Sequence, residues 1–303
     1  MNSVTVTVPA TTANIGPGFD CLGAALTLYN DFTFTILDTP ETVEISVTGT
    51  EAAKVGTDKD NLLYKSFLSL YQHAGLTPPP IKIEIGLNVP LARGLGSSAT
   101  AIVGGLVGAN ELAGQPFSIN DVMELAIALE GHPDNVVPAL FGKCQLSVGQ
   151  PGNWQICEIP WHDDLIPIVA IPNFELSTEA ARAVLPKDYS RQDAIFNIAH
   201  MGLLIRGLET GNGNWLSQAM DDMIHQPYRL TLIKGYDAVK LAALASGAYN
   251  VVISGAGPTL LALAYRPQAE YVVTAMRETW AMEEVEADVQ ILALDLEGVR
   301  VKP

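Results

Sequence analysis

Residues 90–100 read PLARGLGSSAT, a glycine- and serine-rich stretch that is the most informative part of the chain. An alternating apolar run comes before it, and a helical stretch opens at Ser98. Gly94 and Gly96 permit positive φ angles and a close backbone approach, so successive N–H groups can converge on an anion. The helix that follows adds unpaired N–H groups and the positive end of its dipole, while Ser97 and Ser98 supply hydroxyls. We therefore expect this stretch to hold phosphate.

Two familiar phosphate loops and a plain turn share glycine-rich patterns with this stretch. The pattern GxxxxGK[ST] occurs nowhere in the chain, which excludes a Walker loop. Residues 94–99 satisfy GxGxx[GA], but residues 90–93 separate the first glycine from the preceding strand, and residues 118–130 read as a helix where a dinucleotide-binding fold has a strand. A plain turn in a glycine-rich chain is the remaining alternative, and this motif alone would favour it.

Length and composition indicate a globular protein with a large core. A chain of 303 residues exceeds what one core fills comfortably, so one large lobe or two packed lobes are expected. Hydrophobic residues make up 48% of the chain, and no apolar stretch reaches the roughly 18 residues of a membrane span. The start shows no basic segment followed by an apolar one, so we expect a cytoplasmic protein without a membrane partner. Cys21, Cys144 and Cys157 show no CxxC spacing, which fits a reducing compartment and predicts no disulfide.

The charge balance restricts the partners. With 33 acidic and 17 basic residues, the formal net charge of −16 disfavours nucleic acid or anionic lipid. A polyanion can bind such a chain only where helix N-termini, a divalent cation and a few arginines reverse the local field. Arg93, Arg182 and Arg229 lie near glycine, proline or capping signals and are the candidates. A solvated surface position is the alternative for each of them.

Hydrophobic periodicity predicts a mixture of helices and strands, with a change of pattern near residue 150. Four breakers make residues 9–23 a predicted loop between two strands. Ala101, Gly104, Gly105 and Gly108 lie along one side of the helix after the phosphate loop, so this helix should approach a sheet or another helix closely. The predicted strands cover residues 4–8, 23–37, 81–89, 166–171, two segments flanking 254–259, and 288–296. Besides the helix that follows the phosphate loop, the predicted helices cover 62–72, 118–130, 178–185, 190–210, 214–223, 235–245 and 268–284.

Four segments in this order resemble the GHMP small-molecule kinases: PATTANIGPGFDCLG at 9–23, PLARGLGSSAT at 90–100, LEGHPDN at 129–135 and SGAGPT at 254–259. The first and third, with STEAARAVLP at 177–186 and HQPYR at 225–229, look like the branch of this family that phosphorylates L-homoserine. The resemblance spans residues 4 to about 265. It implies a two-lobed α+β fold, with a ribosomal S5 domain 2-like N-terminal lobe, a ferredoxin-like C-terminal lobe and an active site between them. We assign residues 1–155 to an ATP-binding lobe and 156–303 to a lobe that completes the substrate site.

The resemblance also assigns nucleotide and metal roles. Ser98 and Glu130 would bind Mg²⁺, and Asn61 would lie near adenine. A hydroxyl and one carboxylate are a usual protein shell for Mg²⁺, and a carboxylate at a helix C-terminus opposes the dipole unless a cation compensates. A solvated helix end for Glu130 and a helix cap for Asn61 are the alternatives. The loop residues that would wrap the ATP phosphates are Pro90, Leu91, Ala92, Arg93, Gly94, Leu95, Gly96, Ser97, Ser98, Ala99 and Thr100.

Homoserine is a zwitterion with a terminal hydroxyl, and the matched segments offer a group for each part. Arg182 and Arg229 would grip the carboxylate, because a planar guanidinium matches it with two parallel bonds. By resemblance, Asp20 with Asn14 would hold the ammonium. His132 and Asn135 would line the pocket near the hydroxyl. Turn chemistry is the alternative for Asp20 and Asn14, and a satisfied polar position before Pro133 for His132.

The expected reaction is in-line transfer of the ATP γ-phosphoryl group to the hydroxyl, giving O-phospho-L-homoserine for threonine biosynthesis. Positioning and charge neutralisation supply most of the catalysis in such transfers, so a strong base is optional, and no carboxylate in the matched segments is free to serve as one. Ser98, Glu130 and Thr178 are the expected catalytic residues, with Thr178 at the γ-phosphate. Gly255 and Gly257 would close the site from the second lobe.

Three further functions are compatible with parts of the sequence. A kinase of the same fold could act on another small alcohol such as mevalonate, although Asp20 would repel a carboxylate nearby. A non-catalytic sensor is disfavoured by the joint presence of Ser98 and Glu130, and a nicotinamide oxidoreductase by the missing βαβ unit. One residue departs from the family pattern, because Lys143 follows PALFG where another glycine is common. A homodimer is one assembly consistent with the chain.

Overall fold

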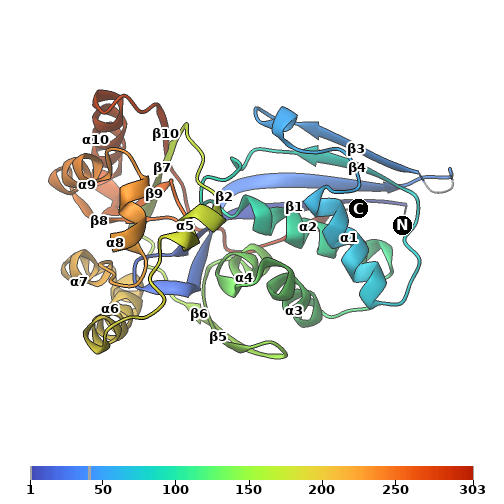
Figure 1. The fold of residues 1–303 in the computed structure, drawn as a ribbon, viewed down its shortest axis with the longest axis horizontal. Coiled ribbons are helices and arrows are strands. Elements are labelled where there is room, and N and C mark those ends of the chain that lie inside the picture. Colours follow the sequence, from blue (N-terminus) through green and yellow to red (C-terminus); the bar gives the residue numbers. More distant parts are fainter. Residues whose placement is uncertain (1, 40–41, 303) are drawn as a thin grey trace.

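The computed structural model describes residues 2–39 and 42–302, which form two lobes of mixed helix and sheet (Figure 1). The first lobe contains a seven-stranded sheet in the order β11-β1-β2-β4-β3, in which β5 also pairs with β2 and with β6. All of its ladders are antiparallel except β3 with β4. Its strands are β1 Ser3–Asn14, β2 Gly18–Ile36, β3 Val43–Thr48, β4 Ile81–Gly86, β5 Cys144–Gln150, β6 Asn153–Ile159 and β11 Arg300–Lys302. Its helices are η1 Ala52–Lys54, α1 Leu62–His73, α2 Ser97–Leu112, α3 Ile119–Glu130 and α4 Pro133–Phe141.

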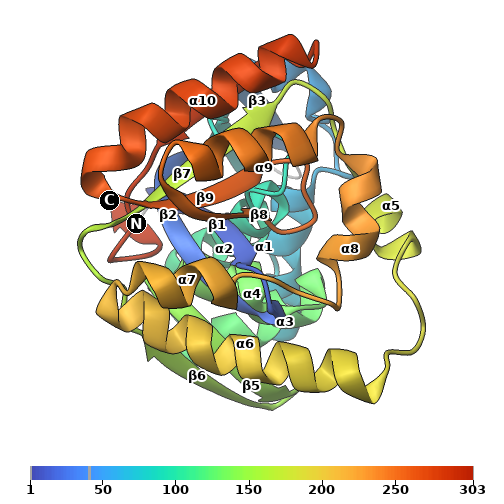
Figure 2. The same cartoon turned by 90° about the vertical axis from the view of Figure 1, so that its left-hand side faces the viewer.

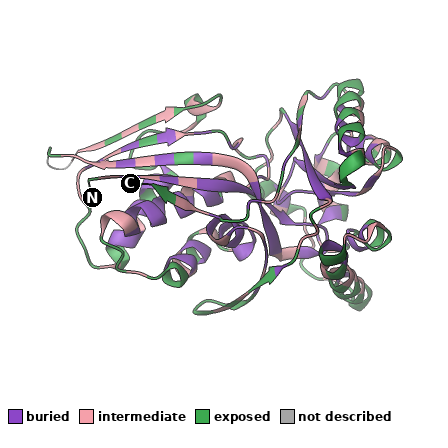
Figure 3. Cartoon of the chain, turned by 180° about the vertical axis from the view of Figure 1, so that it is seen from behind, coloured by how far each residue is buried: buried purple, intermediate pink, exposed green. Residues whose placement is uncertain are grey.

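The helices α1 to α4 lie together on one side of the first sheet (Figure 1), and their inner faces are buried (Figure 3). The predicted close approach of α2 is confirmed. A Cβ atom on Gly104 would lie 2.3 Å from the Phe32 ring, and one on Gly108 would lie 2.3 Å from the Phe34 ring. On the neighbouring side, a Cβ on Gly105 would lie 2.4 Å from the carbonyl oxygen of Leu63 in α1. The missing side chains therefore let α2 sit directly on β2 and α1.

The second lobe is built on a four-stranded antiparallel sheet in the order β10-β7-β9-β8. Helices α9 and α10 cover one of its faces, and α6 and α7 lie on the other side (Figure 2). The strands are β7 Leu165–Pro172, β8 Ala248–Ile253, β9 Leu260–Tyr265 and β10 Ala287–Ile291. The helices are α5 Thr178–Ala183, α6 Arg191–Thr210, α7 Gly213–Ala219, α8 Gln226–Arg229, η2 Leu230–Leu232, α9 Tyr236–Ala245, η3 Arg266–Gln268 and α10 Ala269–Met282.

A shared apolar cluster joins the lobes. Ile15 and Leu22 from the first lobe pack in one cluster with Leu208 of α6 and Leu261 of β9, all fully buried. The predicted division at 155/156 falls within β6, whose partner β5 belongs to the first sheet, and β11 returns to that sheet from the end of the chain. Residues 1 and 303 of the predicted lobes lie outside the described residues.

Most predicted elements are present, and their ends have clear causes. Asn61 caps α1 by accepting a bond from the Tyr64 N–H at 3.2 Å, and Ser118 with Asp121 forms a capping box at the start of α3. The prediction of a loop over 9–23 was wrong. Strand β1 continues through Pro9 to Asn14, because a register shift after Pro9 accommodates the missing N–H.

Among residues 2–39 and 42–302, every helix falls short of the length and apolar character that a membrane crossing requires.

Candidate active site

A cavity of about 680 Å³ is lined by residues of both lobes. The phosphate loop and the C-terminus of α3 border it from the first lobe, and α5, α8 and the segment around Gly255 border it from the second. The predicted residues that line it are Asn14, Asp20, Asn61, Leu91, Ala92, Arg93, Gly94, Gly96, Ser97, Ser98, Glu130, His132, Asn135, Thr178, Arg182, Arg229 and Gly255. The structure thus brings residues more than 200 positions apart to one site.

The two loop glycines are required by the packing of the loop. Gly94 has a φ of 78°, and a Cβ there would lie 2.2 Å from the carbonyl oxygen of Ser254. Gly96 has a φ of 69°, and a Cβ there would lie 2.0 Å from the hydroxyl of Thr11. Within the described part of the chain, no side chain makes a capping hydrogen bond at Gly96, where α2 begins. The first-turn N–H groups of this 16-residue helix are therefore suited to an anion at the loop.

Four residues of the predicted loop lie outside the cavity lining. Leu95 and Ala99 are fully buried in the apolar clusters beneath the loop. The Thr100 side chain is also fully buried. Its hydroxyl donates to the carbonyl of Ser97 at 2.8 Å and accepts from the Asn30 side chain. Pro90 lines a smaller second cavity. Leu95, Ala99 and Thr100 therefore anchor the loop in the protein interior.

The Arg93 guanidinium ties the loop to the second lobe. Its Nε donates to the carbonyl oxygen of Pro172 at 2.9 Å, and its Nη2 donates to that of Asn173 at 3.1 Å. Glu51 and Glu175 lie 3.5 Å away on either side. The sequence predicted a phosphate contact for this side chain. In the structure its hydrogen bonds hold the loop against the end of β7.

Ser98 and Glu130 form an oxygen-rich pair beside the loop. The Ser98 hydroxyl donates to Glu130 Oε2 at 3.0 Å. Glu130 is the last residue of α3, and Gly131 ends that helix in the left-handed conformation. Desolvation raises the pKa of Glu130 against the opposing effects of His132 and Ser98. A hard divalent cation suits this carboxylate, because it would offset both the lost hydration and the helix dipole.

Asn61 also lines the cavity and is nearly fully buried. Besides capping α1, its Nδ2 donates to the carbonyl of Gly56 at 2.7 Å. The apolar side chains of Val55, Leu62 and Leu87 also line the cavity. An apolar wall beside a fixed loop backbone suits a flat heterocycle.

Asp20 and Arg182 are bound to each other. Arg182 Nη2 donates to Asp20 Oδ1 at 2.7 Å, and Nη1 donates to Oδ2 at 3.0 Å. The φ of Asp20 is 56° and that of Asn14 is 70°. The Asn14 side chain accepts from the Asp20 N–H at 3.0 Å and donates to the carbonyl of Gly255 at 2.8 Å. Asn14 therefore positions Asp20 between the lobes.

Arg229 is buried and fixed by backbone carbonyls. Its Nε donates to Ala181 at 3.1 Å and its Nη1 to Gly255 at 3.0 Å. Desolvation lowers its pKa, and the neighbouring Arg182 adds to this effect. Both guanidinium groups lie over the ring of Phe19, at 5.1 Å for Arg229 and 5.6 Å for Arg182. Sequence reasoning missed Phe19, whose only signal was its place in GPGFD.

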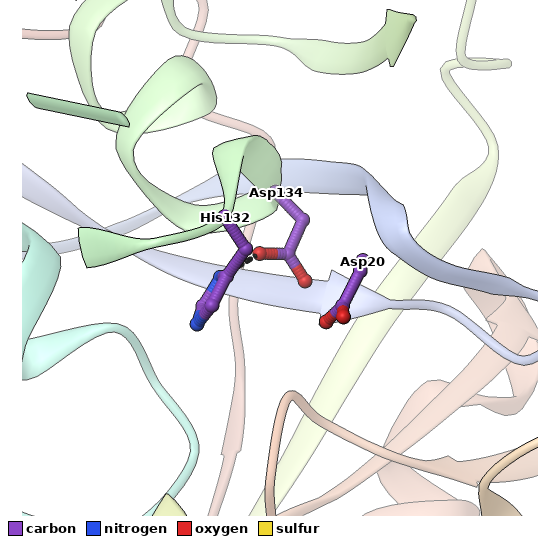
Figure 4. A group of neighbouring side chains, drawn as sticks. All are labelled: Asp20, His132 and Asp134. Atoms are coloured by element: carbon purple, nitrogen blue, oxygen red, sulfur yellow. Dashed lines mark hydrogen bonds and ion pairs between the residues drawn. The ribbon is translucent and has the colours of Figure 1, made fainter. Parts of the chain in front are cut away.

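His132, Asp134 and Asp20 form a polar cluster at the start of α4 (Figure 4). His132 Nδ1 lies 2.5 Å from Asp134 Oδ1, and Asp134 is buried. Burial lowers the pKa of His132, but the hydrogen bond and charge of Asp134 outweigh it and leave the pKa above its ordinary value. The Thr11 hydroxyl donates to Asn135 Oδ1 at 2.8 Å, which sets Asn135 beside Gly96. Asp134 was missed because an acid after proline reads as a helix start.

The second lobe supplies the remaining predicted residues. Thr178 begins α5 next to Ser177, whose hydroxyl accepts from the Ala180 N–H at 3.1 Å. Gly255 lines the cavity, and its N–H donates to the carbonyl of Ala13 at 3.0 Å. The N–H of Gly257 donates to the carbonyl oxygen of Ser254 at 2.8 Å. Among the described residues, Gly257 is outside the set that lines the cavity.

Two family models match the two lobes. The GHMP kinases N terminal domain matches residues 61–143, and the GHMP kinases C terminal matches residues 204–281. A mevalonate kinase from L. major shares the fold at 15% identity, with a TM-score of 0.72 over 96% of this chain and 95% of its own. The fold is thus that of the GHMP kinases, a class that uses ATP.

Curated relatives and a solved structure identify the branch of this class that the chain resembles: the homoserine kinases. Homoserine kinase from Crocosphaera subtropica is 66% identical over 99% of this chain and 98% of its own, and that of Nostoc punctiforme is 62% identical with the same coverage. A crystal structure of homoserine kinase from Cytophaga hutchinsonii superposes with a TM-score of 0.90 at 30% identity, covering 100% of this chain and 98% of the other. The chain belongs to the homoserine kinase family of the GHMP kinases.

Proposed function

We propose that this chain transfers the γ-phosphoryl group of ATP to the side-chain hydroxyl of L-homoserine and so forms O-phospho-L-homoserine. One observation carries the proposal. A single cavity joins an anion-binding loop at 94–98 to a set of charges, Asp20, Arg182 and Arg229, that matches an amino-acid zwitterion. The product is a precursor for threonine biosynthesis.

The nucleotide occupies the first-lobe side of the cavity. Adenine lies by the apolar side chains near Asn61, and the phosphates lie along the loop against the N-terminus of α2. Ser98 and Glu130 would hold Mg²⁺, which neutralises phosphate charge when bound. The hydroxyl and carboxylate fit this ion because both are hard oxygen donors and Glu130 is poorly hydrated.

The amino acid occupies the side bordered by both lobes. Arg229 is held rigidly by Ala181 and Gly255 and receives the carboxylate together with Arg182. Asp20, oriented by Asn14, receives the ammonium. His132 and Asn135 lie between these charges and the phosphate loop and orient the hydroxyl.

Catalysis rests on positioning rather than on a strong base. The transition state of phosphoryl transfer is loose, so alignment and charge neutralisation contribute most of the barrier reduction. Among the described residues that line the cavity, Lys54 is the one lysine, and it is paired with Glu51 and Glu175. Thr178 at the N-terminus of α5 contacts the transferred phosphoryl group in this proposal.

The test is turnover by the purified protein with Mg-ATP and, separately, L-homoserine, L-serine, mevalonate and galactose, followed by ADP release. We expect homoserine to be used far better than the others, because Asp20 opposes a carboxylate that lacks an ammonium. Preferred turnover of mevalonate would support a kinase of the same fold with a different substrate. Tight ATP binding without any turnover would support a sensor.

A further inference from the structure

The Asp20–Arg182 ion pair joins two groups that the proposed function assigns to opposite ends of the substrate. Their two parallel hydrogen bonds, at 2.7 and 3.0 Å, use both Asp20 oxygens and both terminal nitrogens of Arg182. While the two side chains hold each other in this way, neither can hold an ammonium or a carboxylate in the same geometry. A substrate that takes these same two-bond positions on Asp20 or Arg182 therefore requires the pair to open.

The consequences depend on the charges of the ligand. A zwitterion restores both broken interactions, since its ammonium replaces the Arg182 guanidinium at Asp20 and its carboxylate replaces Asp20 at Arg182. A ligand with only one of the two charges restores one interaction and leaves the other group without its partner. Loss of a charged partner in a partly enclosed site costs more than a simple missing contact.

The surroundings of the pair favour this exchange. The side chains of Arg182 and Asp20 are 38% and 34% exposed, so the pair can open without disturbing the core. Arg229, by contrast, is buried and fixed on two backbone carbonyls. Arg182 therefore has the freedom to move, whereas Arg229 stays in place to receive the carboxylate.

A second acid lies next to the position that the ammonium would take. The side chains of Asp134 and Asp20 face each other in the cluster with His132, with their ligand atoms within 4.8 Å (Figure 4). Asp134 keeps its own hydrogen bonds to His132 and Asn135. An ammonium at Asp20 therefore also gains the field of this buried carboxylate.

We propose that the Asp20–Arg182 pair is an internal surrogate for the zwitterion and acts as the specificity determinant of the site, admitting only ligands that satisfy both of its charges at once. The inference rests on the proposed function. On this proposal, alcohols with a single charge bind poorly because they replace only one of the two partners in the Asp20–Arg182 ion pair.

The test uses two truncated substrates. 4-Hydroxybutyrate has the hydroxyl and carboxylate of homoserine without the ammonium, and 3-amino-1-propanol has the hydroxyl and ammonium without the carboxylate. Binding of each is measured by calorimetry in the presence of a non-hydrolysable ATP analogue. We expect Asp20→Asn to bind 4-hydroxybutyrate about threefold to tenfold more tightly than the unmodified protein, because an asparagine amide has one acceptor oxygen and no charge, so the two-bond ion pair with Arg182 is lost. Arg182→Gln should gain similarly for 3-amino-1-propanol, while both variants bind L-homoserine more weakly.

Two controls separate the pair from simple charge effects. Asp134→Asn removes a neighbouring negative charge whose hydrogen bonds go to His132 and Asn135, so it should give a smaller gain for 4-hydroxybutyrate. Glu158→Gln removes the same charge from a half-exposed surface pair with Lys143 and should give none. Asn also tolerates the φ of 56° at position 20, so the variant should fold.

The outcomes distinguish this inference from the proposed function. Homoserine turnover by the unmodified protein with no gain for 4-hydroxybutyrate in Asp20→Asn, or with an equal gain in Asp134→Asn, overturns the surrogate pair alone. Absence of homoserine turnover in the unmodified protein overturns the proposed function. A gain that is larger in Asp20→Asn than in Asp134→Asn, absent in Glu158→Gln and mirrored by Arg182→Gln with the amine, supports the inference.

Discussion

Three residues at and beside the site have a strained backbone conformation. Asn14, Ile15 and Asp20 all have positive φ angles, and Ile15 is β-branched, for which this conformation is costly. The cost is tolerated because Asn14 joins Asp20 to the carbonyl of Gly255 in the second lobe. Strain is therefore concentrated where the two lobes meet over the substrate site.

Arg229→Leu is expected to raise the half-saturating homoserine concentration by roughly tenfold to a hundredfold, the range for losing a charged hydrogen-bond partner. The value for ATP should change little, because Arg229 is bonded to the carbonyls of Ala181 and Gly255 and is proposed to receive the amino-acid carboxylate, whereas the proposed phosphate contacts come from the loop at 90–100. Steady-state kinetics with each substrate varied in turn provides the measurement. Equal effects on both substrates would refute the carboxylate role of Arg229.

Glu130 gives a pH dependence of metal binding. Its pKa is raised by desolvation, so the carboxyl takes up a proton at a higher pH than an ordinary glutamate. Mg²⁺ needs the ionised form, and its apparent affinity should fall as the pH is lowered through this raised pKa and recover above it. Titration calorimetry in buffers of different ionisation enthalpy should detect the released proton, and Glu130→Gln should abolish both the release and the pH dependence.

Lys143 has a φ of 58°, a left-handed conformation that is unfavourable for a residue with a side chain and that suits the glycine expected at this position from the family resemblance. Lys143→Gly is expected to stabilise the protein by about 1 kcal/mol, because the half-exposed ion pair with Glu158 contributes less than the strain that is relieved. Thermal unfolding measures the change. Lys143→Ala serves as the control, since it loses the ion pair and keeps the strain. A less stable glycine variant would show that the strain is negligible.

At the scale of elements, the seat of α2 on the first sheet depends on its glycines. Gly108→Ala is expected to destabilise the protein by roughly 1–3 kcal/mol, because the added methyl would overlap the Phe34 ring. Gly202→Ala in α6 is the matched helical control, where a Cβ meets no atom within 4 Å. It should be neutral or stabilising by about 0.5–1 kcal/mol. Chemical denaturation of both variants gives the comparison, and equal effects would argue against the packing role of Gly108.

The sequence was informative for local elements and less so for contacts between them. Caps at Asn61 and Ser118 and the glycine stripe of α2 are local signals, and the structure confirms them. Pro9 led to a wrong prediction of where the first strand ends, because a register shift after this residue lets β1 continue to Asn14. The pairing of Asp20 with Arg182, 162 positions away, leaves no local trace. The task of Arg93 at the end of β7 is equally nonlocal.

At the scale of the whole molecule, the shared apolar cluster should make the lobes unfold together. Calorimetry is expected to show one transition, with equal calorimetric and van't Hoff enthalpies. Leu208→Ala, in the fully buried part of the cluster, should lower the stability of the whole molecule by about 2–5 kcal/mol without splitting the transition. Ile198→Ala on the same helix, where the side chain is exposed, is the control. Two separate transitions would show that the lobes are independent.

The return of β11 to β1 has a mechanical consequence. Thr5 pairs with Lys302 and Thr7 with Arg300 in an antiparallel ladder, so residues 2 and 302 lie at the same end of the first sheet. Tension applied between these two positions would peel β11 away one pair at a time instead of shearing the sheet. The second lobe would stay outside the path of the force until that short strand had detached.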